Sequence, residues 1–205
     1  MDWIETTANV VQAIAVTAAG VAAVWGLTTW RRELTARRRA ELAEQTLAMF
    51  YEARDIIASA RFPGGYGGEG SSREKGTNET EDETRAKNAF YIPVERLSQK
   101  SEFWGRFEAA RYSFMAVFGG DAAKPFDAVR QVRNRVMLSA RWLIRTYGQV
   151  NEDRPERQQQ REKWEGHIWG DGPDEEDELA KQVDDAVSAI EAVCRPAITG
   201  TVKNQ

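Results

Sequence analysis

The uncharged stretch ANVVQAIAVTAAGVAAVWGLTTW, residues 8–30, decides the fold class of this 205-residue chain. As a helix, its 23 residues would be about 34 Å long, and the hydrocarbon core of a bilayer is about 30 Å thick. Trp25 and Trp30 lie near its far end, where indole rings favour the headgroup region. The pattern predicts a transmembrane helix. The alternative is a buried Ala/Val helix within a soluble bundle.

The charges that flank this stretch predict its orientation. Asp2 and Glu5 precede it, and a basic cluster follows it directly. Arginine beside a span favours the cytoplasmic side and anionic lipid. We therefore expect a single-pass protein of the cell membrane that contacts lipid, with its N-terminus outside and the remaining chain in the cytoplasm. The basic collar consists of Arg31, Arg32, Arg37, Arg38 and Arg39.

Small residues recur every four positions within the predicted span, at Ala18, Ala22 and Gly26. Such spacing allows the backbones of two helices to approach closely in lipid. The pattern indicates a helix-association face and a possible homo-oligomer. In a segment with seven alanines the same spacing also arises by chance.

The rest of the chain shows helical periodicity interrupted by one long polar stretch. Neither Gly nor Pro occurs between Arg31 and Arg61, so we expect the anchor to continue as one long helix. The Gly-, Ser- and Glu-rich stretch 63–84 is expected to be a flexible loop. The predicted divisions are an anchor at 1–30, a collar and long helix at 31–62, the loop at 63–84, a helical bundle at 85–198 and a tail at 199–205.

Four helical segments are expected after the loop. The first begins near Pro93 and ends at Gly119, and the second runs from Asp121 to Tyr147. The others cover 155–168 and a C-terminal stretch stopped by Pro196. No segment alternates apolar and polar residues, so the fold is predicted to be all-α: a transmembrane helix that continues into a cytoplasmic bundle of four to five helices.

The two halves of the predicted bundle carry opposite charges. Residues 86–150 contain 11 basic and 5 acidic side chains, whereas residues 151–205 contain 7 and 14. The arginines of the predicted helix from Asp121 to Tyr147, together with Trp142 and Tyr147, would suit a nucleic-acid partner. The acidic C-terminal half offers a simpler explanation, because it can neutralise that helix within one molecule. With a net charge of −4, nucleic acid is a disfavoured partner. The arginines are Arg130, Arg133, Arg135, Arg141 and Arg145.

Little catalytic chemistry is available in the sequence. The single His167 lies near several carboxylates, but nothing fixes their geometry, and the single Cys194 belongs to an apolar stripe. One histidine and one cysteine exclude a multi-histidine or thiolate metal site. We predict no catalytic, metal or cofactor residues, and no cofactor.

Four stretches carry a resemblance to a known group: RRELTARRRAELAEQTLAMFYEARDIIASARFP, GGEGSSR, FMAVFGGDAAKPF and IEAVCRPAI. They resemble uncharacterised bacterial single-pass membrane proteins with a cytoplasmic helical domain. The resemblance implies the same anchor-plus-helices layout, and it implies no activity and no site residues.

The expected function is that of a non-enzymatic helical scaffold or interaction module, which is held at the cytoplasmic face of the membrane and binds an unknown protein partner or itself. One alternative is an anion- or nucleotide-sensing protein or enzyme that uses the Gly-rich loop, although the loop lacks the Gly-Lys-Ser/Thr ending of a P-loop. The other alternative is an oligomeric pore or membrane effector.

Overall fold

A computed structural model describes residues 2–148, 154–170 and 177–200, with only the backbone for 2–18, 21, 22, 24 and 29. Six α-helices and one 3₁₀ turn account for most of these residues, and the described ranges contain no strand. The all-α prediction is therefore confirmed. The elements are α1 Asp2–Arg61, α2 Glu81–Gln99, α3 Ser101–Phe118, η1 Asp121–Ala123, α4 Lys124–Thr146, α5 Pro155–Trp169 and α6 Glu178–Ile198.

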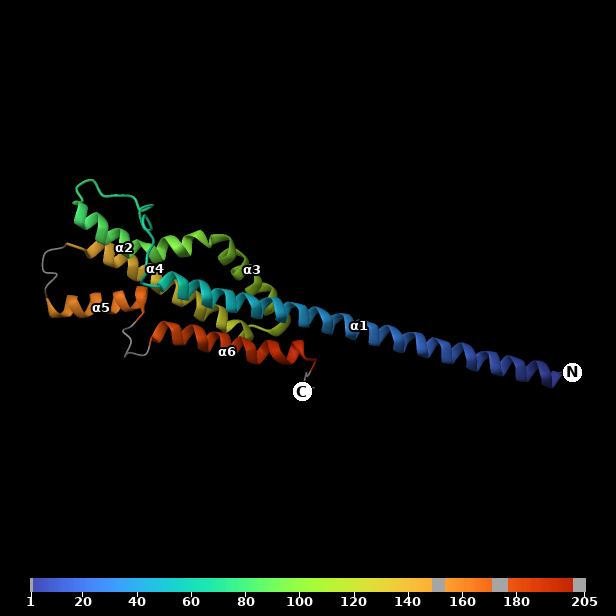
Figure 1. Ribbon diagram of the computed structural model, residues 1–205. Coiled ribbons are helices and arrows are strands. Elements are labelled where there is room, and N and C mark those ends of the chain that lie inside the picture. The colour runs from blue at the N-terminus through green and yellow to red at the C-terminus, as the bar shows by residue number, and fades with distance from the viewer. Residues whose placement is uncertain (1, 149–153, 171–176, 201–205) are drawn as a thin grey trace.

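The two halves of α1 have different surroundings. Its first half projects away from the other helices, and its second half lies inside the bundle (Figure 1). The helix is continuous over 60 residues, as the absence of Gly and Pro from 31–61 led us to expect. Burial begins near Ala43 and continues at helical spacing to Ala60, so this half of α1 supplies one wall of the core.

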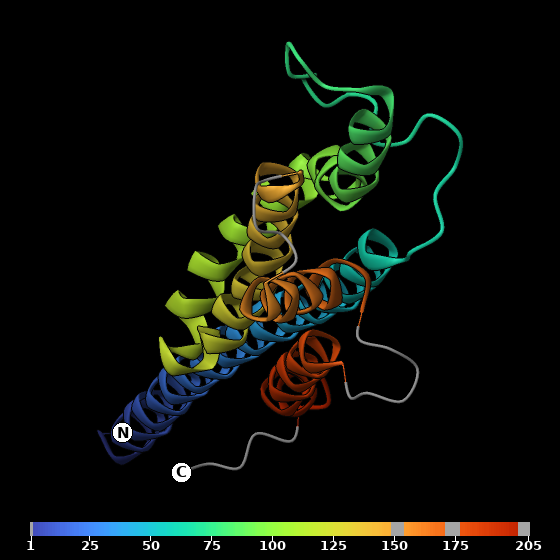
Figure 2. The same cartoon turned by 90° about the vertical axis from the view of Figure 1, so that its left-hand side faces the viewer.

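Helix α4 occupies the middle of the bundle. It packs against α2, α5 and α6, while α1 packs mainly against α6 (Figure 1). Seen from the end of the bundle, α2 and α6 lie on opposite sides, with α4 and α1 between them (Figure 2). The predicted apolar stripe of α4 is fully buried, which explains this position: Val129, Val132, Val136, Ala140 and Leu143.

Aromatic rings join three helices at the centre of the core. Phe50 of α1 meets Phe126 of α4 edge to face at 4.8 Å between centroids and Phe107 of α3 at 5.2 Å. Phe107 and Phe126 lie 4.9 Å apart, so the three rings form one closed cluster. Aromatic pairs in such arrangements contribute about 0.5–1.5 kcal/mol beyond their area burial.

The start of α2 differs from the prediction. Pro93 was expected near the beginning of a helix, but it is buried inside α2, which begins twelve residues earlier at Glu81. A capping box sets this start: the Thr80 side chain accepts from the Glu83 N–H, and the Glu83 carboxylate accepts from the Thr80 N–H. Residues 81–84 therefore belong to the helix and not to the loop.

Two further helix boundaries differ from the prediction. The expected helix from Pro93 to Gly119 is divided at Lys100 into α2 and α3, with no Gly or Pro at the break. Helix α6 continues past Pro196 to Ile198, because a proline in the last turn removes only one main-chain hydrogen bond. The predicted ends at Gly119 and Tyr147 are confirmed as C-caps, and Gly119 has the positive φ of 92° that favours glycine there.

Candidate functional site

The projecting half of α1 carries the predicted anchor and collar. Every described side chain from 19 to 38 is exposed, including Trp25 at 77% and Trp30 at 60%. Gly26 is also exposed, whereas the side chains of Ala18 and Ala22 lie outside the described residues. The described part of the chain contains no helix with the length and apolarity needed to cross a membrane.

The arginines of the collar have different surroundings. Arg31, Arg32 and Arg38 are exposed, and Arg37 forms an ion pair with Glu33 at 2.6 Å, one turn earlier. Arg39 is half-buried, with its guanidinium 5.0 Å from the centre of the Phe118 ring. The collar therefore ends where the bundle begins, because Arg39 packs against the end of α3.

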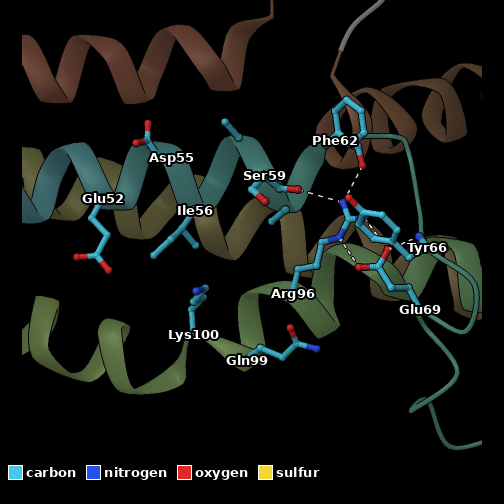
Figure 3. A pocket seen from close by; sticks show the side chains of 12 residues that line it. Glu52, Asp55, Ile56, Ser59, Phe62, Tyr66, Glu69, Arg96, Gln99 and Lys100 are labelled. Carbon is cyan, nitrogen blue, oxygen red and sulfur yellow. Dashed lines mark hydrogen bonds and ion pairs between the residues drawn. The ribbon is translucent and has the colours of Figure 1, made fainter.

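A large cavity lies at the opposite end of α1. It measures about 950 Å³ and is bounded by α1, by the chain that leaves α1 and by the end of α2 (Figure 3). Two exposed aromatic side chains, Phe62 and Tyr66, stand at its rim. Glu52 and Asp55 line the groove from α1, and Lys100 lines it at the α2–α3 break. In Figure 3, Glu52 points toward the side of α1 where Lys100 lies, and Asp55 points away from it. We call this cavity the α1–α2 groove.

Arg96 forms the inner end of the α1–α2 groove. Its guanidinium donates to the main-chain oxygens of Ser59 at 3.0 Å, Phe62 at 2.9 Å and Gly64 at 2.6 Å. It also forms an ion pair with Glu69 at 2.7 Å, which lowers the pKa of that carboxyl group. Because its N–H groups hold the end of α1 and the loop, Arg96 fixes the shape of the groove. The same N–H groups are therefore not available to bind an anion.

The Gly-rich loop is held by ion pairs with its own carboxylates. Arg73 and Glu79 form an ion pair at 2.5 Å, with 8% and 10% of their side chains exposed, and Lys87 lies 3.3 Å from Glu79. The main-chain N–H of Gly70 donates to the carboxylate of Glu95. The expected flexible loop is thus attached to α2 in this structure. The Arg73 guanidinium and the Gly70 N–H, two donors that could serve a phosphate, are thus already bound to carboxylates.

Carboxylates of both the α3–α4 hairpin and the C-terminal half lie near the basic helix α4. Helices α5 and α6 pack against α4, as expected of the acidic C-terminal half. Arg130 pairs with Asp127 at 2.5 Å and with Glu108 at 3.7 Å, both within the hairpin. Arg135 pairs with Glu178 of α6 at 3.4 Å.

The surroundings of His167 and Cys194 indicate that both side chains have structural roles. The Nδ1 atom of His167 lies 2.8 Å from the hydroxyl oxygen of the buried Ser139, and burial lowers the pKa of the imidazole. Ser139 is too enclosed to meet a substrate. Burial also raises the pKa of the Cys194 thiol to about 11, which disfavours the nucleophilic thiolate. The nearby Asp171 and Asp174 lie outside the described residues. Within the described ranges, no cluster of three or more acidic, His or Cys side chains could hold a metal.

No family model matches the chain, and comparisons with curated proteins and with solved structures give no similar protein. The resemblance to bacterial single-pass membrane proteins stays an expectation from the sequence. The α1–α2 groove and the projecting half of α1 are thus the two features on which a functional argument can rest.

Proposed function

We propose that this chain is a membrane-anchored, non-enzymatic interaction module, with residues 8–30 in the bilayer and the helical bundle on the cytoplasmic side. The observation that carries the proposal is the division of α1 into a projecting half and a buried half. A bundle does not need a helix extension whose described side chains, Trp25 and Trp30 among them, are all exposed.

The spacing along α1 supports an anchor with a separate binding domain. Thirteen residues separate Trp30 from Ala43, the first buried position, which is about 20 Å of helix. The exposed arginines Arg31, Arg32 and Arg38 lie on this connecting segment, where they would meet anionic headgroups. Glu52 of the α1–α2 groove lies about 33 Å from Trp30 along the helix, which leaves the groove accessible to a cytoplasmic partner.

The α1–α2 groove supplies the expected binding surface for a protein partner. Aromatic side chains such as Phe62 and Tyr66 are typical anchors of protein interfaces when a polar rim surrounds them. Glu52 and Asp55 on one wall favour a partner segment with a basic residue beside an apolar one. The bound segment would add to the Arg96-centred network without needing to open it.

Topology labelling tests the anchor. Because Cys194 is the single cysteine, the variant Cys194→Ala allows one new thiol to be placed at Asp2→Cys or at Lys203→Cys. In intact spheroplasts, a membrane-impermeant maleimide should label the first thiol and not the second, and detergent should make both reactive. Equal labelling of both positions, or recovery of the chain from the aqueous fraction, would contradict the proposal.

A further inference from the structure

A second cavity, separate from the α1–α2 groove, lies where α2 and α3 meet α4. Its volume is about 370 Å³, and the N-terminal turns of α3 provide Ser101, Trp104 and Gly105 to its lining. Helix α4 provides Arg133, and the rest of the wall includes Ser98. We call this cavity the α3–α4 pocket.

Arg133 and Arg39 are the two half-buried arginines among the described residues that stack on an aromatic ring, have a buried Nε atom without an acceptor and form no ion pair; of the two, Arg133 lines a cavity. Its guanidinium carbon lies 4.9 Å from the centre of the Trp104 ring, and its Nε atom is buried without an acceptor. No ion pair joins it to any residue that the structure describes. Four other shielded arginines each have a carboxylate oxygen at 2.5–3.2 Å: Arg61, Arg73, Arg96 and Arg111.

No ion pair with a described residue offsets the partial desolvation of Arg133. Burial lowers the pKa of its guanidinium, and the more distant Glu108 acts in the opposite direction. A half-buried cation without a hydrogen-bonded anion loses hydration free energy, part of which an entering carboxylate would recover.

Trp104 gives an independent second observation. Only 4% of this side chain is exposed, yet its indole N–H has no acceptor among the described residues. Buried indole N–H groups normally find a partner. Two N–H donors on neighbouring side chains, Trp104 and Arg133, thus lack acceptors beside one cavity that also presents the Ser98 and Ser101 side chains.

The rest of the wall selects among anions. Glu108 also lines the pocket, and its negative charge repels a dianion. Arg130 lies 3.7 Å from this carboxylate and neutralises part of its charge. Leu97, Met137 and the Trp104 ring provide apolar surface. A single guanidinium fork matches the two oxygens of a carboxylate. We infer that the α3–α4 pocket binds a small monocarboxylate with a short apolar or aromatic body, held by Arg133 with the indole N–H of Trp104 as second donor.

Benzoate is the probe for this site, and its neutral analogue benzamide is the control. The full chain in detergent micelles, with ¹⁵N-labelled tryptophan, gives one indole signal per Trp, and the variant Trp104→Phe assigns the relevant one. Benzoate should shift the Trp104 signal saturably, and benzamide should bind about tenfold more weakly or worse, because it lacks the charge-assisted bonds.

Arg133→Gln should weaken benzoate binding by about tenfold or more, whereas Arg141→Gln, an exposed arginine of the same helix, should leave it unchanged. Arg133→Lys keeps the charge and loses the fork, so it should bind benzoate with intermediate affinity and keep the native indole spectrum. No saturable shift at millimolar benzoate, equal binding of benzamide, tighter binding of inorganic phosphate, or an equal effect of both glutamine variants would each overturn the inference.

Discussion

At the scale of single residues, two arginines tie helix ends to acidic side chains. Arg61 donates to the main-chain oxygens of Gly166 and His167, both at 2.9 Å, and pairs with Asp177 at 2.9 Å. It thereby satisfies carbonyls at the end of α5 and holds the N-cap residue of α6. Arg96 repeats the arrangement at the end of α1. Each guanidinium thus adds a long-range contact to a helix end.

Replacing Arg61 with methionine should destabilise the bundle by about 3 kcal/mol, because it leaves the Asp177 carboxylate without its buried cation and removes two hydrogen bonds to the α5 carbonyls. The side chain is only 6% exposed, so methionine keeps much of the apolar packing. The measurement is chemical denaturation of the full chain in detergent. The matched control is Arg85→Met, whose ion pair with Asp82 is exposed and should cost less than about 1 kcal/mol. Equal losses in the two variants would contradict this role.

The ion pair in the Gly-rich loop should make stability depend on pH. Arg73 holds the pKa of Glu79 at about 2, below its ordinary value of 4.5. A carboxyl group whose pKa is lowered by folding stabilises the fold fully above its unfolded pKa and loses this contribution as pH falls through the folded value. The melting temperature of Glu79→Gln should therefore lie below that of the unmodified chain at pH 6, and the difference should shrink between pH 4.5 and pH 2.

If the difference in melting temperature between Glu79→Gln and the unmodified chain stayed constant from pH 6 to pH 2, Glu79 would act through packing and not through its charge. Glu81→Gln is the control, because Glu81 is exposed in the first turn of α2 and forms no described ion pair. It should change the melting temperature little at either pH. Amide exchange of the Gly70 N–H, which bonds to Glu95, reports whether the loop itself detaches.

At the scale of elements, helical periodicity predicted most of the core. The apolar stripe of α4 is buried, and so are four of the five residues expected to form that of α6, because a 3.6-residue period leaves one face for packing. The four are Leu179, Val183, Ala186 and Ile190, and the fifth, Val193, is partly buried. The α2 start was missed even though its capping box, Thr80 to Glu83, stands in the sequence, because the surrounding acidic residues resemble a solvated loop. The break at Lys100 has no Gly or Pro, so tertiary packing sets it.

The candidate sites were less predictable than the helices. The α1–α2 groove depends on Arg96 reaching the end of α1 from 32 to 37 residues away, and no local pattern encodes that contact. The ion pair of Arg73 with Glu79 is close in sequence, but the composition of the loop masked it. Short-range signals predict elements, whereas these sites arise from which elements meet.

The Phe50 cluster should make the bundle cooperative, since it joins α1, α3 and α4. Phe50→Ala should cost about 3–5 kcal/mol, because it opens a cavity at a fully buried position, and Phe50→Leu should cost clearly less. Denaturation followed by far-UV and near-UV circular dichroism measures both losses. Loss of near-UV signal well before far-UV signal in the unmodified chain would show that the helices do not unfold as one unit.

At the scale of the whole molecule, one helix belongs to two environments. The second half of α1 shares the core of the bundle, and the described side chains of residues 19–38 are all exposed. Substitutions in the two halves should therefore have separable effects. Changes near Phe50 act on the free energy of unfolding, and changes near Trp25 act on the partition between membrane and water.

The double variant Ala19→Arg, Ala23→Arg tests this separation. Both side chains are exposed, so the free energy of unfolding of the bundle should stay within about 0.5 kcal/mol. Two charges near the middle of the span add about 5–7 kcal/mol to the insertion free energy, so the chain should move from the alkaline-washed membrane pellet to the aqueous fraction. Phe50→Ala is the opposite control, because it should destabilise the bundle and leave the protein in the pellet. If the arginine variant stayed with the membrane, lipid contact would have to come from another surface, and the projecting half of α1 would need a protein partner to explain its exposed tryptophans.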